Sequence, residues 1–198
     1  NRIEAVQPIS KKGRKDLKPY AIKVADGNPR LLEWLFEILT QPDLKHETIL
    51  DQMAQKETRF REDILVQALL DQQKPELRQL LGRMMVYDIA VPFAAMKAVC
   101  DPIFALETHK DRALALGLLE ITRSDEDLFR VPRILAPFLE KDQPKDKQAL
   151  FQTACATLHE IWWQQTDNPI EERLFEIHRL ALMAENPEIA LDLGNRLA

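Results

Sequence analysis

The stretch Asp26–Arg30 reads Asp-Gly-Asn-Pro-Arg and carries the start signal of an amphipathic helix. Asp and Asn side chains can accept hydrogen bonds from the free N–H groups of a first helical turn, and Pro29 has its φ angle preset for that turn. Apolar residues then recur at helical spacing. They are Leu31, Leu32, Leu35, Phe36 and Leu39. The sequence therefore predicts a helix that begins beside Pro29.

Arg30 is the unexpected member of this stretch. A cation in the first turn is disfavoured by the helix dipole, by about 0.3–1 kcal/mol. A helix start that faces an anion would instead gain from the positive charge. Two interpretations stay open: an ordinary capped helix with an exposed arginine, or a helix start that faces an anionic ligand.

The composition favours helices in the rest of the chain. Only 5 glycines are present against 12 prolines, and Leu, Ala, Glu, Lys and Gln are abundant. Apolar residues make up 45% of the 198 residues and charged residues 30%, so the chain can bury a core. The formal net charge of −5 argues against broad, non-specific binding of nucleic acid.

The two cysteines, Cys100 and Cys155, lie far apart and form no CxxC pair. This spacing predicts buried free thiols of a reducing compartment. No stretch approaches 18 uninterrupted apolar residues, and the N-terminus lacks a signal-peptide core, so we expect a cytoplasmic protein. Because the chain opens at Asn1 without a methionine, we also expect a fragment or a processed product.

Residues 1–20 combine a short apolar element with a basic run. The apolar residues are Ile3, Val6 and Ile9, and the cations are Lys11, Lys12, Arg14, Lys15 and Lys18. A solvated loop and a phosphate-contacting segment are both open, although no aromatic side chains are interleaved to stack on bases. From residue 21 to 74 the pattern predicts a small helical subdomain, with one helix ending near Thr40 and others at about 43–56 and 59–72.

Residues 75–140 predict a winged-helix domain. Three short helices begin at Pro75, at Phe93 and near residue 107. Apolar and polar residues then alternate on both sides of the polar turn 124–127, which indicates a β-hairpin. A further short helix begins at Pro132.

Residues 141–198 begin with a polar linker at 141–147 and then predict antiparallel helices at about 146–165 and 169–185, with a third from Pro187. Short breaks between helices of this length are typical of a tetratricopeptide-like array. Trp162 and Trp163 are expected as packing residues or as an exposed contact. The predicted fold class is therefore mainly α: a helical lid subdomain, a winged helix with a short hairpin, and a tetratricopeptide-like region.

Sequence signatures of self-contained catalysis are missing. No phosphate-binding loop, GxSxG elbow, HExxH motif or Rossmann glycine fingerprint is present. The histidines are scattered over different helices, at His46, His109, His159 and His178. We therefore predict no catalytic residue, no metal site and no enzymatic activity for this chain by itself.

Two segments and the order of the parts resemble a known class. Residues 27–35 read GNPRLLEWL and residues 128–135 read LFRVPRIL. Both resemble the region after the nucleotide-binding core in STAND-type signal-transduction NTPases, which belong to the AAA+-related P-loop superfamily, and in particular in bacterial members with tetratricopeptide tails. The resemblance covers nearly the whole chain after residue 20.

The resemblance implies a nucleotide role for Gly27 and Pro29, which would contact the bound nucleotide, and for Arg30, which would reach its phosphates. It makes residues 1–10 the last edge of the NTPase core. The P-loop core itself would be a partner upstream in the parent chain, and ATP or ADP with magnesium would bind there and not to this chain alone. Where relatives carry a phosphate-sensing histidine, this sequence has Pro132, with Arg133 as the neighbouring cation.

The leading hypothesis is a regulatory and interaction fragment of a STAND-type signalling ATPase. It would close over the nucleotide of the core and couple it to a helical array that senses a protein partner or ligand. One alternative is a winged-helix DNA-binding regulator, which would use Lys110 and Arg112 of the helix at 107–117. The other is a free-standing helical interaction scaffold. Membrane and nucleic acid are not expected as partners.

Overall fold

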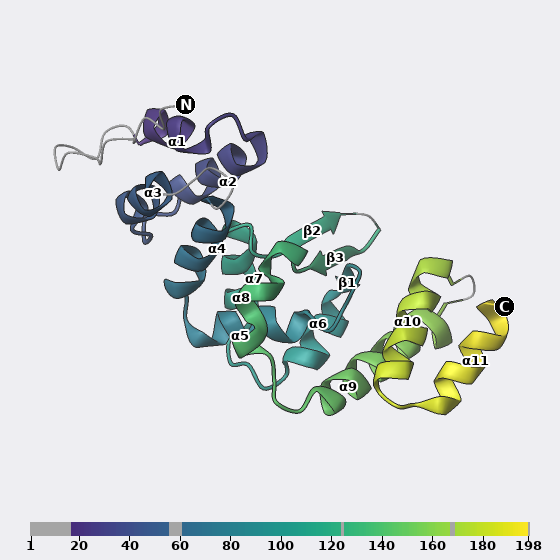
Figure 1. Cartoon of the computed structure of the whole chain (residues 1–198). Coiled ribbons are helices and arrows are strands. Elements are labelled where there is room, and N and C mark those ends of the chain that lie inside the picture. Colours follow the sequence, from purple (N-terminus) through teal and green to yellow (C-terminus); the bar gives the residue numbers. More distant parts are fainter. Residues whose placement is uncertain (1–16, 56–60, 124, 167–168, 198) are drawn as a thin grey trace. The chain divides into compact units, whose positions relative to one another are not determined.

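The computed structural model describes residues 17–55, 61–123, 125–166 and 169–197, without the side chains of Arg30, Arg196 and Leu197. The described chain is mainly helical and carries a three-stranded antiparallel sheet (Figure 1). This confirms the mainly α fold class with a short hairpin. The chain divides into two compact units, residues 1–74 with 112–117, and residues 75–111 with 118–198.

The first unit contains α1 (Lys18–Ala25), α2 (Pro29–Leu39), α3 (His46–Ala54) and α4 (Arg61–Asp71). Its core is formed by the apolar faces of these helices, and the buried residues include Leu31, Leu35, Ile38, Ile49, Leu50, Met53, Leu65 and Leu69. One member of the apolar run of α2 differs from the prediction. Phe36 is 37% exposed because it lies on the other side of the helix from Leu31, Leu35 and Ile38.

Residues 112–117 belong to the first unit through specific hydrogen bonds. The indole Nε1 of Trp34 donates to the carbonyl oxygen of Leu116 at 2.7 Å. Next to it, Gly117 has φ +65°, and a Cβ atom there would lie 3.0 Å from Trp34 Nε1. A side chain at position 117 would therefore meet both backbone strain and the indole ring. This explains the glycine at the end of the predicted helix at 107–117.

The second unit begins with α5 (Pro75–Met84), β1 (Val91–Pro92), α6 (Phe93–Cys100), the part of α7 (Leu106–Ala115) up to Asp111, β2 (Glu120–Arg123) and β3 (Asp127–Arg130). The strands are antiparallel in the order β1-β3-β2, with Phe129 of β3 opposite both Val91 and Ile121. The predicted hairpin is confirmed. Strand β1 was not predicted, since the sequence indicated only a connection at Val91–Pro92.

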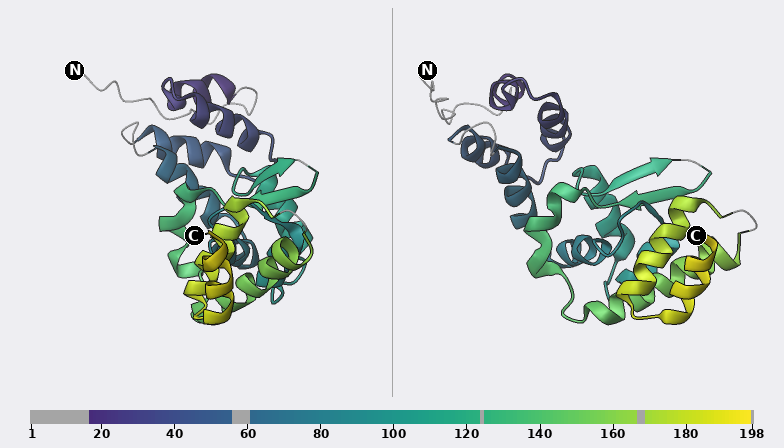
Figure 2. Two further views of the ribbon diagram at one scale, coloured as in Figure 1. Left: turned by 90° about the vertical axis from the view of Figure 1, so that its right-hand side faces the viewer. Right: turned by 45° about the vertical axis from the view of Figure 1, so that its right-hand side comes forward.

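The rest of the second unit is helical. After β3 come a 3₁₀ turn (Arg133–Leu135), α8 (Ala136–Leu139), a second 3₁₀ turn (Glu140–Asp142), α9 (Lys147–His159), a π-helical turn (Glu160–Gln164), α10 (Glu171–Met183) and α11 (Pro187–Leu197). Figure 2 shows α10 and α11 side by side. The predicted helix at 146–165 is therefore not α-helical throughout. A π turn shifts the helix face, and Trp162 within it is 1% exposed.

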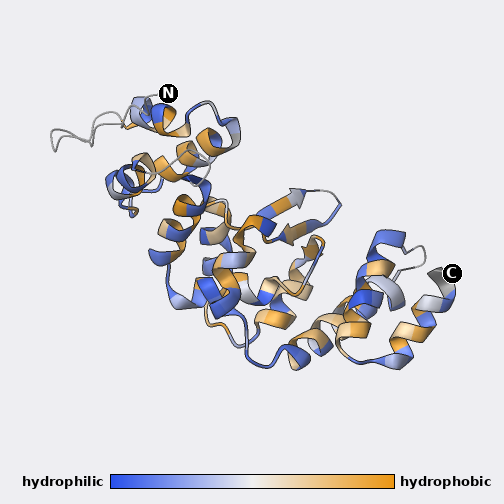
Figure 3. Cartoon of the chain, viewed as in Figure 1, coloured by the Kyte–Doolittle hydropathy of each residue, from blue (hydrophilic) through white to orange (hydrophobic). Residues whose placement is uncertain are grey.

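Apolar and polar residues alternate around the helices of the second unit, as expected for elements with one buried face (Figure 3). Both cysteines are buried and free, as predicted. Burial raises the pKa of Cys100 to about 12 and that of Cys155 to about 11. These thiols therefore act as small apolar side chains of the core and not as nucleophiles.

Candidate functional site

The N-terminus of α2 is capped by Asn28, as the sequence predicted. Its Oδ1 accepts a hydrogen bond from the backbone N–H of Leu31 at 3.1 Å. Its Nδ2 donates to Oε1 of Glu62 at 2.7 Å, and Glu62 stands in the first turn of α4. The Asn28 side chain therefore caps α2 and links its start to α4.

The residues before α2 form a turn that is open to solvent. Gly27 has φ +81°, and a Cβ atom at this position would meet no atom within 4 Å. Asp26 also has a positive φ, of 50°. Pro29 is the first residue of α2 and is exposed, whereas the side chain of Arg30 lies outside the described part of the structure. The three residues predicted to contact nucleotide thus lie within four positions at one helix start, and Gly27 and Pro29 are both exposed.

Two charged residues of α4 support this turn. The buried Arg61 donates from Nη1 to the carbonyl oxygen of Val24 at 2.5 Å, and the same nitrogen lies 3.9 Å from Oδ2 of Asp26. Glu62 binds Asn28 as described above. Neither role is predictable from local sequence patterns, because only the fold brings the start of α4 beside the start of α2. The carboxylate of Glu62 opposes an anion at this turn, and Arg30 is the cation that could compensate for it.

The first cation named for DNA binding, Lys110, is engaged within the second unit. Its Nζ lies 5.0 Å from the ring centroid of Phe93 and 5.7 Å from that of Phe129. It also lies 3.2 Å from Oδ1 of Asp111. A lysine held over two aromatic rings and beside a carboxylate gains little from a phosphate.

The second cation, Arg112, is engaged within the first unit. Its Nη2 lies 2.7 Å from Oδ2 of Asp43, and its Nη1 donates to Oε1 of Gln41 at 2.9 Å. A weaker bond of 3.4 Å joins its Nε to Oε1 of Gln73. The guanidinium of Arg112 therefore has partners already, and neither cation named in the DNA-binding alternative is available without breaking contacts.

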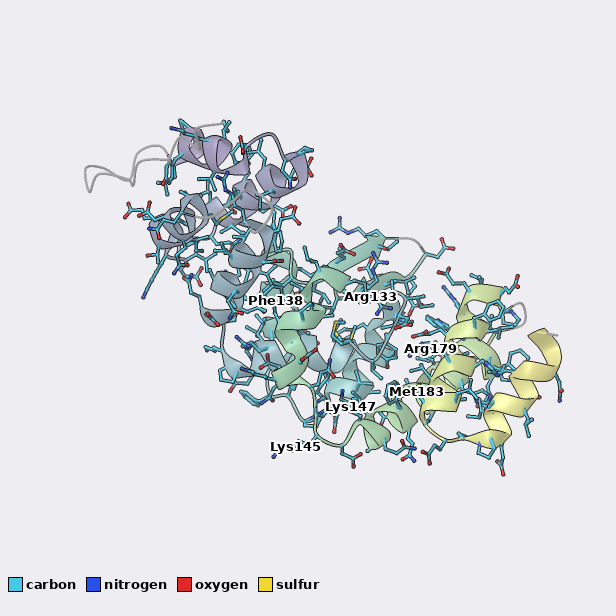
Figure 4. All side chains as sticks on the ribbon, viewed as in Figure 1. Arg133, Phe138, Lys145, Lys147, Arg179 and Met183 are labelled. Atoms are coloured by element: carbon cyan, nitrogen blue, oxygen red, sulfur yellow. The ribbon has the colours of Figure 1, made fainter. Side chains whose placement is uncertain are left out.

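A cluster of four charged side chains in the second unit was not predicted. We call it the Asp88 cluster, and it consists of Asp88, Arg133, Glu176 and Arg179. Arg179 Nε and Arg133 Nη2 lie 3.3 and 2.7 Å from the two carboxylate oxygens of Asp88. Arg133 follows β3 and Arg179 lies on α10 (Figure 4). The cluster thus joins α10 to the turn before β1 and to the segment after β3.

Backbone atoms complete the Asp88 cluster. Oε1 of Glu176 accepts a hydrogen bond of 2.8 Å from the backbone N–H of Asp88, and Arg179 Nη2 donates to the carbonyl oxygen of Val86 at 2.7 Å. Burial alone would lower the pKa of Arg179. Its hydrogen bonds to Glu176 and the charges of Glu176 and Asp88 outweigh burial and raise that pKa. The guanidinium of Arg179 therefore stays charged, within a network of hydrogen bonds and ion pairs that is structural.

Arg133, the cation next to Pro132, is 58% exposed on its side chain and pairs with Asp88. No group of three or more His, Cys, Asp or Glu side chains in the described residues could hold a metal ion. Within the same part of the chain, no helix is long and apolar enough to cross a membrane.

No family model, curated protein or solved structure matches the chain.

Proposed function

We propose that the chain is a regulatory and protein-interaction module of a STAND-type signalling NTPase and is not itself an enzyme. The observation that supports a coupling role most directly is the Asp88 cluster. It connects α10, within the helical region proposed to be tetratricopeptide-like, to the turn before β1 and to the segment after β3. A partner that shifts α10 would strain the same hydrogen bonds that hold the wing segment.

The nucleotide role proposed for Gly27, Pro29 and Arg30 is supported by the open turn at the start of α2. The positive end of the α2 dipole favours an anion, although Asn28 already accepts the Leu31 N–H. A Cβ atom at Gly27 would meet no atom within 4 Å, so a ligand has room to approach the backbone there. Without a core, the negative charge of Glu62 weakens anion binding at this turn. We therefore propose that tight nucleotide binding needs the P-loop core, with ATP or ADP and magnesium held there.

The test is a titration of the ¹⁵N-labelled chain with Mg·ATP, read from amide chemical shifts. We expect shifts at Gly27 and Arg30 with a dissociation constant in the millimolar range. Arg30→Ala should abolish them, because the phosphate loses its cation. Lys23→Ala is the matched control, since it removes an exposed cation of the neighbouring helix α1.

Two outcomes would contradict the proposal. Shifts that are missing at the start of α2, or that are equal in both variants, would return the chain to the scaffold alternative. Micromolar affinity for ATP would contradict the need for a separate core.

A further inference from the structure

The second unit carries a cleft that neither the nucleotide role nor the packing of the helices explains. It has a volume of about 420 Å³, within the range of ligand-binding clefts. Its lining residues come from the turn before β1 and from α10, and they are Ile89, Glu171, Glu172, Phe175, Glu176 and Arg179. The cleft therefore lies beside the Asp88 cluster, which includes two of its lining residues.

The apolar wall of the cleft is open to solvent. Phe175 on α10 is 52% exposed. Ile89, from the turn before β1, is the other apolar residue that lines the cleft. Large apolar side chains left open beside a cleft are typical of a binding surface.

The charges of the cleft are unbalanced. Glu176 and Arg179 neutralise each other through two hydrogen bonds of 2.8 Å. Glu171 and Glu172 are exposed and form no ion pair with a described residue. The helix dipole favours acids in the first turn of α10, but it does not explain an exposed phenylalanine beside them. The cleft thus combines an apolar wall with two unpaired negative charges.

We propose that this cleft binds a basic, apolar segment of a partner protein: an arginine or lysine next to a large apolar side chain. The cation would pair with Glu171 and Glu172, and the apolar side chain would cover Phe175 and Ile89. Charge complementarity selects this occupant, because nucleic acid and acidic peptides would meet two carboxylates of like charge. The proposal rests on the interaction role given above and specifies its partner, but it does not depend on nucleotide binding.

The test uses three fluorescent hexapeptides and the full chain, with binding read by anisotropy at low and at physiological salt. The first peptide has alternating arginine and leucine, the second has glutamate in place of arginine, and the third has arginine with alanine in place of leucine. We expect the first to bind most tightly and to weaken as salt rises. The charge reversal E171K/E172K should weaken its binding about tenfold. Phe175→Ala should have a similar effect, because it removes the apolar wall.

Matched controls come from α10 and from the turn and helix that follow it. E185K/E188K reverses two exposed acids outside the cleft, and Leu182→Ala truncates an apolar residue of α10 that is 59% exposed and does not line it. Both should bind like the unmodified chain. Equal binding of the three peptides, equal losses in cleft and control variants, or no binding of the arginine–leucine peptide would overturn the proposal. The proposal would also be overturned if the unmodified chain self-associates and Phe175→Ala abolishes this self-association, because a second copy of the chain would then be the partner that covers the cleft. No nucleotide is present, so these failures leave the Mg·ATP test unaffected.

Discussion

Glu176 and Arg179, one helical turn apart on α10, are joined by two hydrogen bonds of 2.8 Å, and the carboxylate of Glu176 is buried while the arginine remains partly exposed. Such a pair at i, i+3 is usually a surface feature of little energetic weight. Here it is different, because Glu176 also accepts the backbone N–H of Asp88. Glu176 therefore joins α10 to the turn at Asp88, which lies 88 residues earlier in the sequence.

Replacing Glu176 tests this attachment. Glu176→Ala leaves a partly buried guanidinium without its main partner and the Asp88 N–H without an acceptor. We expect a loss of about 2–3 kcal/mol in the free energy of unfolding, measured with urea. Glu176→Gln keeps an acceptor for the N–H and should lose about half as much. Glu172→Ala, at an exposed site of the same helix, should stay within about 0.5 kcal/mol. A Glu176→Ala variant as stable as Glu172→Ala would refute the attachment.

Gly82 on α5 gives a prediction that opposes helix propensity. A Cβ atom there would lie 2.6 Å from the carbonyl oxygen of Asp142. The carboxylate of Asp142 accepts from Nε and Nη2 of Arg78 as a bidentate pair. Gly82→Ala should therefore destabilise the chain by about 1–3 kcal/mol, although alanine is the better helix former. Gly194→Ala on α11 is the control. Its Cβ atom would lie 3.5 Å from His178 Nε2, so propensity should dominate and stability should rise by up to about 1 kcal/mol. Equal changes in urea unfolding would contradict the close contact.

Local patterns predicted the helices well, because each helix needs only its own spacing and caps. The cap at Asn28 and the buried face of Leu31 and Leu35 are examples. The same reasoning failed at β1. Two residues are too few to show alternation, and Pro92 argues against a strand, yet Val91 pairs with Phe129. Pairing between residues so far apart in sequence leaves no local signal.

The candidate sites show the same limit. The open turn at Gly27 could be predicted, because glycine and proline determine the backbone there. The neighbouring carboxylate of Glu62 could not, since it comes from another helix. Likewise, Glu176 and Arg179 have the spacing of a surface pair, and nothing in that spacing indicates burial against Asp88. The assignment to a STAND-type protein, the nucleotide contacts and the tetratricopeptide-like array stay predictions.

His159, at the end of α9, predicts a pH dependence of stability. Burial lowers its pKa from the ordinary value of 6.5, and the charge of Asp192 opposes this shift. Between the folded and the unfolded pKa the unfolded chain binds more protons, so stability is complete above pH 6.5 and falls as the pH drops below it. His159→Gln should flatten this slope, whereas Asp192→Asn should steepen it by lowering the pKa further. Urea unfolding from pH 8 to pH 5 measures both. A slope that His159→Gln leaves unchanged would assign the effect to other groups.

Asn28 has two separable roles, and one substitution keeps the first and removes the second. Asn28→Asp retains an oxygen that can accept the Leu31 N–H, but it loses the amide that donates to Glu62 and places two carboxylates together. We expect faster hydrogen exchange of the α2 amides and a loss of about 1–2 kcal/mol. Adding Glu62→Gln should restore most of this loss, because the glutamine amide can donate to the new carboxylate. Asn28→Ala, which removes both roles, should cost about 1 kcal/mol and gain nothing from Glu62→Gln.

If the effects of N28D and E62Q on the free energy of unfolding add to within about 0.3 kcal/mol, the two side chains are not coupled. A second measurement is the Mg·ATP titration of Glu62→Gln alone, in which we expect a larger chemical-shift change at the Arg30 amide. Together with non-additive stabilities of N28D and E62Q, this result would identify Glu62 as the charge that weakens anion binding at the start of α2.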